Sequence, residues 1–294
     1  MRIFLTGGTG FIGGHVRREL LRRGHEIRLL VHTRGDGTEA GIEEIAGDIT
    51  RPETFFGVLE GCDATVNLVG IIREFPNRGI TFERLHVEAT RNVIEAARNA
   101  GVKRHLQMSA LGTRQNASSR YHRSKFRAEE EVRLSGLEWT VFRPSIVFGP
   151  EDDFVNKLAG YIRSYPAVPV IGNGTYRLQP VSADDVARCF ALALEMPETV
   201  GRTFELCGPD RLPYNDLLDT IGRVLGKKHV VKIPNPLTLM AAIVPVLQGF
   251  SFFPITMDQI LMLVEENICD GTWQETFGFE PERFEQGIAR YLKP

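Results

Sequence analysis

Two residues of the segment YHRSK carry side chains that can act together on a proton. Tyr121 and Lys125 stand four residues apart in a stretch with helical periodicity, so both side chains leave one face of the predicted helix, one turn apart. Bringing a tyrosine pKa from about 10 to about 7 requires roughly 4 kcal/mol of phenolate stabilisation. An ammonium about 4 Å away, at an effective dielectric of about 20, supplies a term of about that size. The pair is therefore predicted to act as an acid/base at neutral pH.

Ser109 places a hydroxyl close to this pair along the chain. It directly follows the predicted strand Arg104–Met108 and precedes Tyr121 by a short loop. A serine at the carboxyl end of a strand can hydrogen-bond a substrate carbonyl while the tyrosine delivers a proton. That arrangement suits hydride transfer with a nicotinamide cofactor. The alternative for Ser109 is a serine that only caps a loop. The alternative for Tyr121 and Lys125 is chance, because a tyrosine and a lysine four residues apart occur in many helices.

A glycine-rich turn lies near the start of the chain. The segment TGGTGFIG follows the apolar run Met1–Leu5 and precedes an amphipathic stretch. In such a turn, bare backbone N–H groups and the positive end of a helix can approach a pyrophosphate closely. A side chain at Gly7 or Gly10 would obstruct the turn or the ligand, and one at Gly13 would obstruct the packing of the helix on the strand. The alternative is a tight turn that binds nothing.

The first half of the chain alternates apolar strand-like runs with helical patterns, which is typical of parallel strands joined by right-handed crossovers. We expect an α/β fold with a doubly wound parallel Rossmann sheet over residues 1–150 and a site at the carboxyl ends of its strands. The predicted strands are Arg2–Leu5, Glu26–Val31, Ile42–Ala46, Ala64–Val69, Arg104–Met108 and Trp139–Phe142, and the predicted helices are Phe11–Arg23, Pro52–Leu59, Phe82–Asn99 and Tyr121–Leu134.

Residues 151–294 are predicted to form a smaller substrate-side region that either follows the first domain or interleaves with it. Helices are expected at Ala183–Leu194 and Tyr214–Leu225. The stretch Ile233–Met257 contains no charged residue, but four prolines argue against a membrane-spanning helix. Three interpretations stay open: an apolar helix packed in the smaller domain, a lid over an apolar substrate, and a peripheral contact with a membrane or a partner complex.

The charge composition gives no indication of nucleic-acid binding. The 294 residues include 35 basic and 37 acidic side chains, and a net charge of −2 does not attract a polyanion. The four cysteines show no CxxC pair and no neighbouring histidine cluster, and we expect reduced thiols and no metal site. Because the first strand begins at Met1 or Arg2, we expect no targeting segment and a cytoplasmic protein, which the apolar stretch could associate with a membrane.

The end of the second predicted strand bears on the choice of cofactor. An enzyme that uses NAD usually has a carboxylate there, whereas this chain reads LVHTRGD, with His32 and Arg34 at the expected place. A guanidinium can pair with a 2′-phosphate through two hydrogen bonds, and a carboxylate would repel that phosphate. The sequence therefore favours NADP(H) over NAD(H). The alternative is a solvated Arg34, with Asp36 contacting the ribose.

Ordered motifs along nearly the whole chain resemble the short-chain dehydrogenase/reductase superfamily. The resemblance is to its extended or atypical NAD(P)-dependent epimerase/dehydratase-like members, akin to the 39 kDa accessory subunit of respiratory complex I. The motifs are TGGTGFIG, GDIT, VNLVGI, HVEATRNVIEAA, MSALG, YHRSK, FRPSIVFGP, QPVSADDVA and FELCGPD. One departure is His86, where many relatives carry asparagine.

The resemblance implies roles at matching positions. The catalytic trio would be Ser109, Tyr121 and Lys125, with Lys125 also bonding the nicotinamide ribose. The cofactor-binding set would be Gly7, Thr9, Gly10, Phe11, Ile12 and Gly13 at the pyrophosphate, His32 and Arg34 at the ribose phosphate, Asp48 and Ile49 at the adenine, Leu68, Val69 and Gly70 at the adenosine ribose, and Pro144, Ile146 and Val147 in a segment beside the nicotinamide.

Two functions from different classes remain open. One is an NADP(H)-dependent oxidoreductase or isomerase acting on a carbonyl or alcohol of a small or lipophilic substrate. The other is a non-catalytic protein that holds NADPH and serves as an assembly or scaffold component of a membrane complex, because the relatives akin to the complex I subunit often keep the dinucleotide as a structural ligand.

Overall fold

The computed structural model describes residues 1–35, 39–248 and 255–293. The chain forms two compact units and passes between them three times. The first unit comprises Met1–Arg143 and Asp184–Phe204, and the second comprises Pro144–Ala183 and Glu205–Pro294. The division therefore falls at Arg143 rather than at residue 150, and a later segment returns to the first unit.

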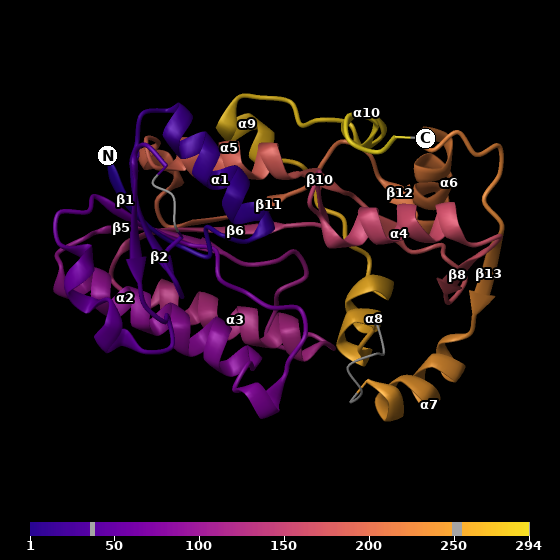
Figure 1. The fold of residues 1–294 in the computed structure, drawn as a ribbon, viewed down its shortest axis with the longest axis horizontal. Coiled ribbons are helices and arrows are strands. Elements are labelled where there is room, and N and C mark those ends of the chain that lie inside the picture. The colour runs from indigo at the N-terminus through magenta and orange to yellow at the C-terminus, as the bar shows by residue number, and fades with distance from the viewer. Residues whose placement is uncertain (36–38, 249–254, 294) are drawn as a thin grey trace. The chain divides into compact units, whose positions relative to one another are not determined.

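A parallel sheet organises the first unit (Figure 1). Its strands lie in the order β3-β2-β1-β4-β5-β6-β11, and the pairings from β3 through β6 are parallel. The chain moves outward in one direction from β1 and then restarts at β4 in the other, which puts a topological switch point between these two strands. The predicted doubly wound sheet is confirmed. The strands are β1 (Arg2–Thr6), β2 (Glu26–Val31), β3 (Ile42–Ala46), β4 (Ala64–Asn67), β5 (Arg104–Met108), β6 (Glu138–Pro144) and β11 (Arg202–Leu206).

Helices cover both faces of this sheet. Figure 1 shows α1 (Phe11–Arg22) and α5 (Ala183–Ala193) over one face and α2 (Ala89–Asn99) and α3 (Arg120–Arg133) over the other. The buried side of α2 repeats at helical spacing, and its side chains pack against core residues of β1 and β2. This packing fixes α2 against the sheet on the face that it shares with α3.

Two predicted helices differ in detail. The segment expected as one helix over Pro52–Leu59 forms two 3₁₀ turns, Pro52–Thr54 and Phe56–Leu59. Phe55 interrupts them with a non-helical backbone, because its ring is buried and stacks on Phe4. The expected helix Phe82–Asn99 begins with a π-helical segment, Glu83–Glu88, before α2.

The second unit consists of short strand pairs and helices around its own core. Strand pairs β7/β10 and β8/β13 are parallel, and β9/β12 is antiparallel. Apolar side chains of α4, α6 and α10 share one cluster. The elements are β7 (Val147–Phe148), α4 (Asp153–Ser164), β8 (Val168–Ile171), β9 (Arg177–Leu178), β10 (Val181–Ser182), β12 (Leu212–Pro213), α6 (Tyr214–Val224), β13 (Lys232–Asn235), α7 (Leu237–Leu247), α8 (Met257–Val264), α9 (Trp273–Phe277) and α10 (Phe284–Ala289).

The expectation of reduced thiols is wrong for two cysteines. Cys207 and Cys269 form a disulfide within the second unit, whereas Cys62 and Cys189 are free and buried. The Trp273 indole donates to the Cys207 carbonyl. Gln179 bridges the two cysteine segments, since its Oε1 accepts from the Cys269 amide and its Nε2 donates to the Gly208 carbonyl. Sixty-two residues separate the bonded cysteines, so no spacing motif indicated the pair.

Part of the charge-free stretch forms α7, and most of this helix is exposed rather than packed in a core. Its Leu239, Ile243 and Val246 side chains are exposed, and Val244 is buried. Residues 249–254 of the stretch lie outside the described residues. Among the helices that the structure describes, none has both the length and the apolar character needed to cross a bilayer.

Candidate active site

The glycine turn joins β1 to α1 at the switch point of the sheet. Gly7 has a positive φ of 74°, and a Cβ there would lie 2.9 Å from the backbone of Leu68 and Val69. A Cβ on Gly13 would lie 2.1 Å from the Gly7 carbonyl oxygen, so the helix can pack on the turn only with glycine here. Both positions are thus constrained by the protein's own backbone.

Gly10 differs from the other two glycines. It precedes α1 as its N-cap with an ordinary extended backbone, and the nearest atom to an added Cβ is the Gly7 oxygen at 3.4 Å. No side chain caps the N-terminus of α1, and its first turn has no acidic residue. The turn and the helix end therefore fit a phosphate group, which such N–H groups bind. Thr9 is exposed, and Phe11 and Ile12 are partly buried.

Lys125 reaches from α3 to the ends of β4 and β5. Its Nζ donates long hydrogen bonds to the carbonyls of Val69 (3.5 Å) and Met108 (3.4 Å). A Cβ on Gly70 would lie 2.8 Å from this Nζ, so glycine at position 70 leaves room for the amine. Burial lowers the pKa of Lys125 to about 8, against a smaller raising effect of Glu129. The structure thus brings Lys125, predicted to bind the nicotinamide ribose, close to Val69 and Gly70, predicted to bind the adenosine ribose.

Tyr121 lies one turn earlier on α3 and is enclosed by rings. Phe82, His86 and His122 each make an edge contact with it, at centroid distances of 5.9, 5.4 and 5.4 Å. Burial raises the pKa of Tyr121 to about 12. This is opposite in direction to the shift expected from a neighbouring ammonium, because loss of water around the phenolate is the cause of the shift and the charge of Lys125 does not contribute to it. At neutral pH the side chain is a phenol that can donate its proton.

Ser109 follows β5 as predicted, but its hydroxyl has a partner within the protein. Oγ donates to Glu129 Oε1 at 2.5 Å and also lies 3.3 Å from Thr113 Oγ1. The Glu129 carboxylate is fully buried and accepts two hydrogen bonds from Arg143, at 2.8 and 2.7 Å. The serine therefore belongs to a buried ionic network under the end of the sheet. Its expected contact with a substrate carbonyl stays a prediction.

His86 joins three segments around Tyr121 and Lys125. Its Nε2 accepts the Ile71 backbone N–H at 3.1 Å, which places the ring proton on Nδ1. Nδ1 then donates to Ser124 Oγ at 2.7 Å, and that hydroxyl donates to the Tyr121 carbonyl at 2.7 Å. Burial, followed by the charge of Lys125, lowers the pKa of His86 to about 2, so the ring is neutral.

The predicted adenine and ribose residues have mixed environments. Asp48 Oδ1 accepts from the N–H and the hydroxyl of Thr50, both at 2.8 Å. Burial raises the pKa of Asp48, but these bonds, together with the charges of His32 and Arg84, lower it overall. The Ile49 side chain is buried in the core. His32 and Arg34 are exposed just beyond β2, and Asp36 lies outside the described residues.

Asn67 is a buried polar residue that the sequence prediction missed. At the end of β4, its Oδ1 accepts from Thr6 Oγ1 (2.8 Å) and from the Val69 N–H (3.2 Å). Its Nδ2 donates to Gln107 Oε1 (3.0 Å) and to Thr90 Oγ1 (3.2 Å). The network connects β1, β4, β5 and α2 beneath the switch point. A lone asparagine inside an apolar strand was the available signal.

Other predicted residues belong to the second unit. Pro144 ends β6, and the Ile146 N–H donates to Asn267 Oδ1 at 3.1 Å. Val147 begins β7 and pairs with Val181. Their expected contact with a nicotinamide stays a prediction.

The parallel sheet, its switch point and the glycine turn define a Rossmann-type nucleotide-binding protein. Residues 3–207 match the NAD dependent epimerase/dehydratase family, and the chain belongs to that family. The nicotinamide dinucleotide is accordingly the cofactor class that the site fits.

Two curated relatives are similar over most of the chain. A mouse protein, NADH dehydrogenase [ubiquinone] 1 alpha subcomplex subunit 9, mitochondrial, is 32% identical over 242 residues, which cover 79% of this chain and 63% of the mouse protein. The ceramide reductase of Caulobacter vibrioides is 26% identical over 245 residues, covering 81% of this chain and 75% of that protein. Among solved structures, that of gox2253 has a TM-score of 0.76 at 25% identity and covers 98% of this chain and 95% of its own.

Proposed function

We propose that the protein is an oxidoreductase or isomerase that uses NADP(H) in preference to NAD(H) and acts on a carbonyl or alcohol of a lipophilic substrate. The observation that carries the proposal is the joint burial of Tyr121 and Lys125 on α3, beside the ends of β4 and β5. The bound cofactor would supply the hydride. The name of the Caulobacter relative, ceramide reductase, supports a reduction on a lipid.

Within this proposal each residue has one task. The turn from Gly7 to Gly13 binds the pyrophosphate, and Lys125 bonds the nicotinamide ribose. Tyr121, with a pKa near 12, is protonated at neutral pH and donates its proton to a substrate carbonyl oxygen as the alkoxide forms. The edge contacts of Phe82, His86 and His122 fix the phenol ring and exclude water from it.

Replacing Tyr121 by phenylalanine tests the catalytic role. Tyr121→Phe removes the proton donor and retains the ring, so we expect NADPH binding within about threefold of wild type and a loss of turnover of about 10³-fold, in the range seen for general acids. The assay is NADPH oxidation with a panel of long-chain aldehydes and ketones. Tyr165→Phe, at an exposed tyrosine, is the matched control. Unaltered turnover in Tyr121→Phe would overturn the assignment.

The NADP(H) preference rests on Arg34. Its side chain is exposed just beyond the end of β2, and the proposal is that it pairs with a 2′-phosphate there. We expect Arg34→Ala to weaken NADPH binding about tenfold and to change NADH binding less than twofold, since only the former loses a charge-assisted pair. Equal losses for both dinucleotides would contradict the preference.

A second candidate function is a cofactor-holding component of a membrane complex, and α7 is the observation that favours it. Eight of its eleven residues are exposed and none is charged, so the exposed arc spans about 240° at 100° per residue. The apolar stripe by which a helix packs on a protein is usually about 100° wide. The wider exposed arc of α7 is better suited to insertion into the apolar part of a membrane surface than to packing in one protein groove. The name of the mouse relative makes that protein a subunit of a mitochondrial NADH dehydrogenase subcomplex.

Vesicle flotation separates the two candidates. Binding through a charge-free helix should persist at high salt with phosphatidylcholine vesicles, because no ion pair is involved. The double variant Ile243→Asp/Val246→Asp should remain unbound, and Tyr161→Asp/Tyr165→Asp is the control on α4 and the loop after it. Retained NADPH with vesicle binding and no activity on the substrate panel would favour the scaffold.

A further inference from the structure

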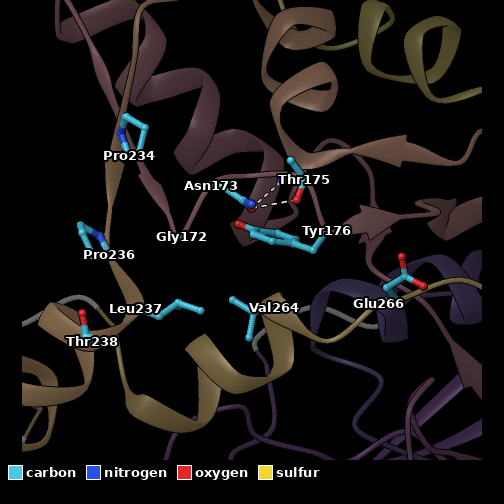
Figure 2. A pocket seen from close by; sticks show the side chains of 10 residues that line it. All are labelled: Gly172, Asn173, Thr175, Tyr176, Pro234, Pro236, Leu237, Thr238, Val264 and Glu266. Atoms are coloured by element: carbon cyan, nitrogen blue, oxygen red, sulfur yellow. Dashed lines mark hydrogen bonds between the residues drawn. The ribbon is translucent and has the colours of Figure 1, made fainter.

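The hollow of the second unit, shown in Figure 2, has a mostly apolar wall. It lies among the loop after β8, the segment from β13 into α7, and the end of α8. Its carboxylate, Glu266, is already paired with Arg177 at 2.7 and 2.8 Å. Polar side chains that bear on the proposed chemistry are instead gathered in the first unit, around Asn67 and Gln107.

Asn67 and Gln107 lie side by side near the ends of β4 and β5. The register of the sheet pairs the two residues directly. Each is 1% exposed, so the polar atoms of both carboxamides must find partners within the protein.

These two carboxamides and Lys125 close a ring of five hydrogen bonds. The Val69 N–H donates to Asn67 Oδ1 (3.2 Å), and Asn67 Nδ2 donates to Gln107 Oε1 (3.0 Å). Gln107 Nε2 donates to the Met108 carbonyl (3.1 Å). Lys125 Nζ donates to the same carbonyl (3.4 Å) and to that of Val69 (3.5 Å), which closes the ring.

The backbone groups of this ring decide how both carboxamides point. The Val69 N–H can only donate, so Asn67 turns Oδ1 toward it and Nδ2 toward Gln107. The Met108 carbonyl can only accept, so Gln107 turns Nε2 toward it and Oε1 toward Asn67. Both ends require the same arrangement, and flipping one carboxamide would place a donor against a donor or an acceptor against an acceptor.

Asn67 also shapes the end of β4. Its side chain accepts the N–H of the residue two positions later, which is the pattern of an Asx turn. The turn fixes the Val69 N–H and thereby limits how the Val69 carbonyl can rotate. The two bonds from Lys125, at 3.5 and 3.4 Å, are at the long end of the hydrogen-bond range, so a small rotation of that carbonyl would break one of them.

We propose that Asn67 is a positioning residue for Lys125: its carboxamide, held in one orientation by Gln107, directs the Val69 carbonyl so that the ammonium is held between the ends of β4 and β5. An ammonium has three N–H donors, and the two carbonyls take two of them. The third remains for the ribose, and only this last contact rests on the proposed function.

Two titratable groups besides the ring act on Lys125. Glu129, on the same helix, raises its pKa. His86 lies near the amine, because a Cβ on Gly70 would be 2.8 Å from Lys125 Nζ and 3.6 Å from His86 Nε2, and this imidazole is neutral. Substitutions at position 67 leave both groups in place, so a change in the Lys125 pKa would report on the carbonyls.

The test follows Lys125 in the full-length chain by NMR, with lysine labelled with carbon-13 at Cε and no dinucleotide present. The chain has seven lysines, and Lys125→Arg identifies the signal. Hydrogen bonds to a charged group favour its charged form, so we expect the pKa of Lys125 to fall by about one unit in Asn67→Ala. Asn67→Ser keeps a hydroxyl that can accept the Val69 N–H, and a fall of about half a unit is expected.

Thr90→Val is the matched control. Thr90 is as buried as Asn67 and accepts from its Nδ2 at 3.2 Å, but it lies outside the ring. The variant loses a buried hydrogen bond, so its stability in urea should fall while the pKa of Lys125 stays within about 0.2 units of wild type. Equal shifts in Asn67→Ser and Thr90→Val, or no shift in Asn67→Ser, would overturn the proposal even where Asn67→Ala does not fold.

NADPH binding separates this inference from the proposed function. We expect about tenfold weaker binding for Asn67→Ala and less than twofold for Thr90→Val. A shifted Lys125 pKa with unaltered NADPH binding in Asn67→Ala would mean that Lys125 does not bond the ribose, which contradicts the proposed function and leaves the role of Asn67 established. An unshifted pKa contradicts that role whatever the dinucleotide does.

Discussion

The Ser109 hydroxyl donates a hydrogen bond of 2.5 Å to Glu129, a carboxylate that no water can reach and that two arginines hold in place. Glu129 lies on α3, and Arg143 lies on β6. The network therefore fixes the helix that carries Tyr121 and Lys125 against the end of the sheet. On this geometry Ser109 is a positioning residue first, and its proton is not available to a substrate unless this bond breaks.

Replacing Ser109 by alanine distinguishes the two roles. We expect Ser109→Ala to lower the free energy of unfolding by about 1–2 kcal/mol, since a buried hydrogen bond to a charged group is lost. Turnover should fall less than tenfold. The measurements are urea unfolding and steady-state kinetics, with a double-mutant cycle to Glu129→Gln to obtain the coupling. A loss of turnover above 100-fold at unchanged stability would instead favour contact with the substrate carbonyl.

The sheet could be predicted from the sequence because each strand is a short apolar run ending at polar or glycine residues. β5, RHLQM, is an exception in composition: all five positions are buried although Arg104, His105 and Gln107 are polar, and its predicted bounds are still those observed. The glycine turn was predictable from its spacing, since Gly13 must be glycine to pass the Gly7 carbonyl six residues earlier and Gly7 has a positive φ. The close approach of Gly7 to Leu68 and Val69 is a contact between distant segments, which the local sequence does not show.

The network around the site was not predictable. Glu129 stands in the run RAEEEVR, where nothing distinguishes it from its more exposed neighbours Glu130 and Glu131. Its burial depends on Ser109 and Arg143, which are distant in sequence. The direction of the Tyr121 pKa shift was also not predictable. The sequence shows the charge of Lys125, from which a lower pKa was expected, but it does not show the burial that raises the pKa.

Burial of Lys125 predicts a stability that rises with pH. Its pKa is about 8 in the folded protein and near its ordinary value of 10.5 when unfolded, so between these values the unfolded chain binds more protons. The free energy of unfolding should therefore increase from pH 8 to 10, by up to about 3 kcal/mol. Urea titrations of wild type and Lys125→Met measure this. If the two proteins show the same pH slope, the lysine is not the source.

Burial of His86 predicts acid sensitivity in a different window. The folded pKa is about 2 and the ordinary value is 6.5, so the unfolded chain takes up the proton first as pH falls below 6.5. Stability should then drop progressively, by roughly 2–3 kcal/mol at pH 4.5. His86→Asn keeps a donor and an acceptor for Ser124 and Ile71 and should be less acid-sensitive than wild type. His229→Asn, at an exposed histidine, is the control, and an equal gain there would refute the explanation.

A substitution at Gly10 tests cofactor binding with little effect on the stability of the fold. A methyl group at this position meets only the Gly7 oxygen, at 3.4 Å, and the backbone conformation is open to alanine. Because Gly10 is the N-cap of α1, where alanine is a poorer cap, Gly10→Ala should lower the free energy of unfolding by no more than about 1 kcal/mol. If the turn holds a pyrophosphate, the methyl group occupies the space of the ligand, and NADPH binding should weaken more than tenfold. Gly14→Ala, in the next positions of α1 and 3.7 Å from Arg18, should retain binding and gain up to about 1 kcal/mol of stability. Normal NADPH binding by Gly10→Ala would mean that the dinucleotide does not lie against this turn.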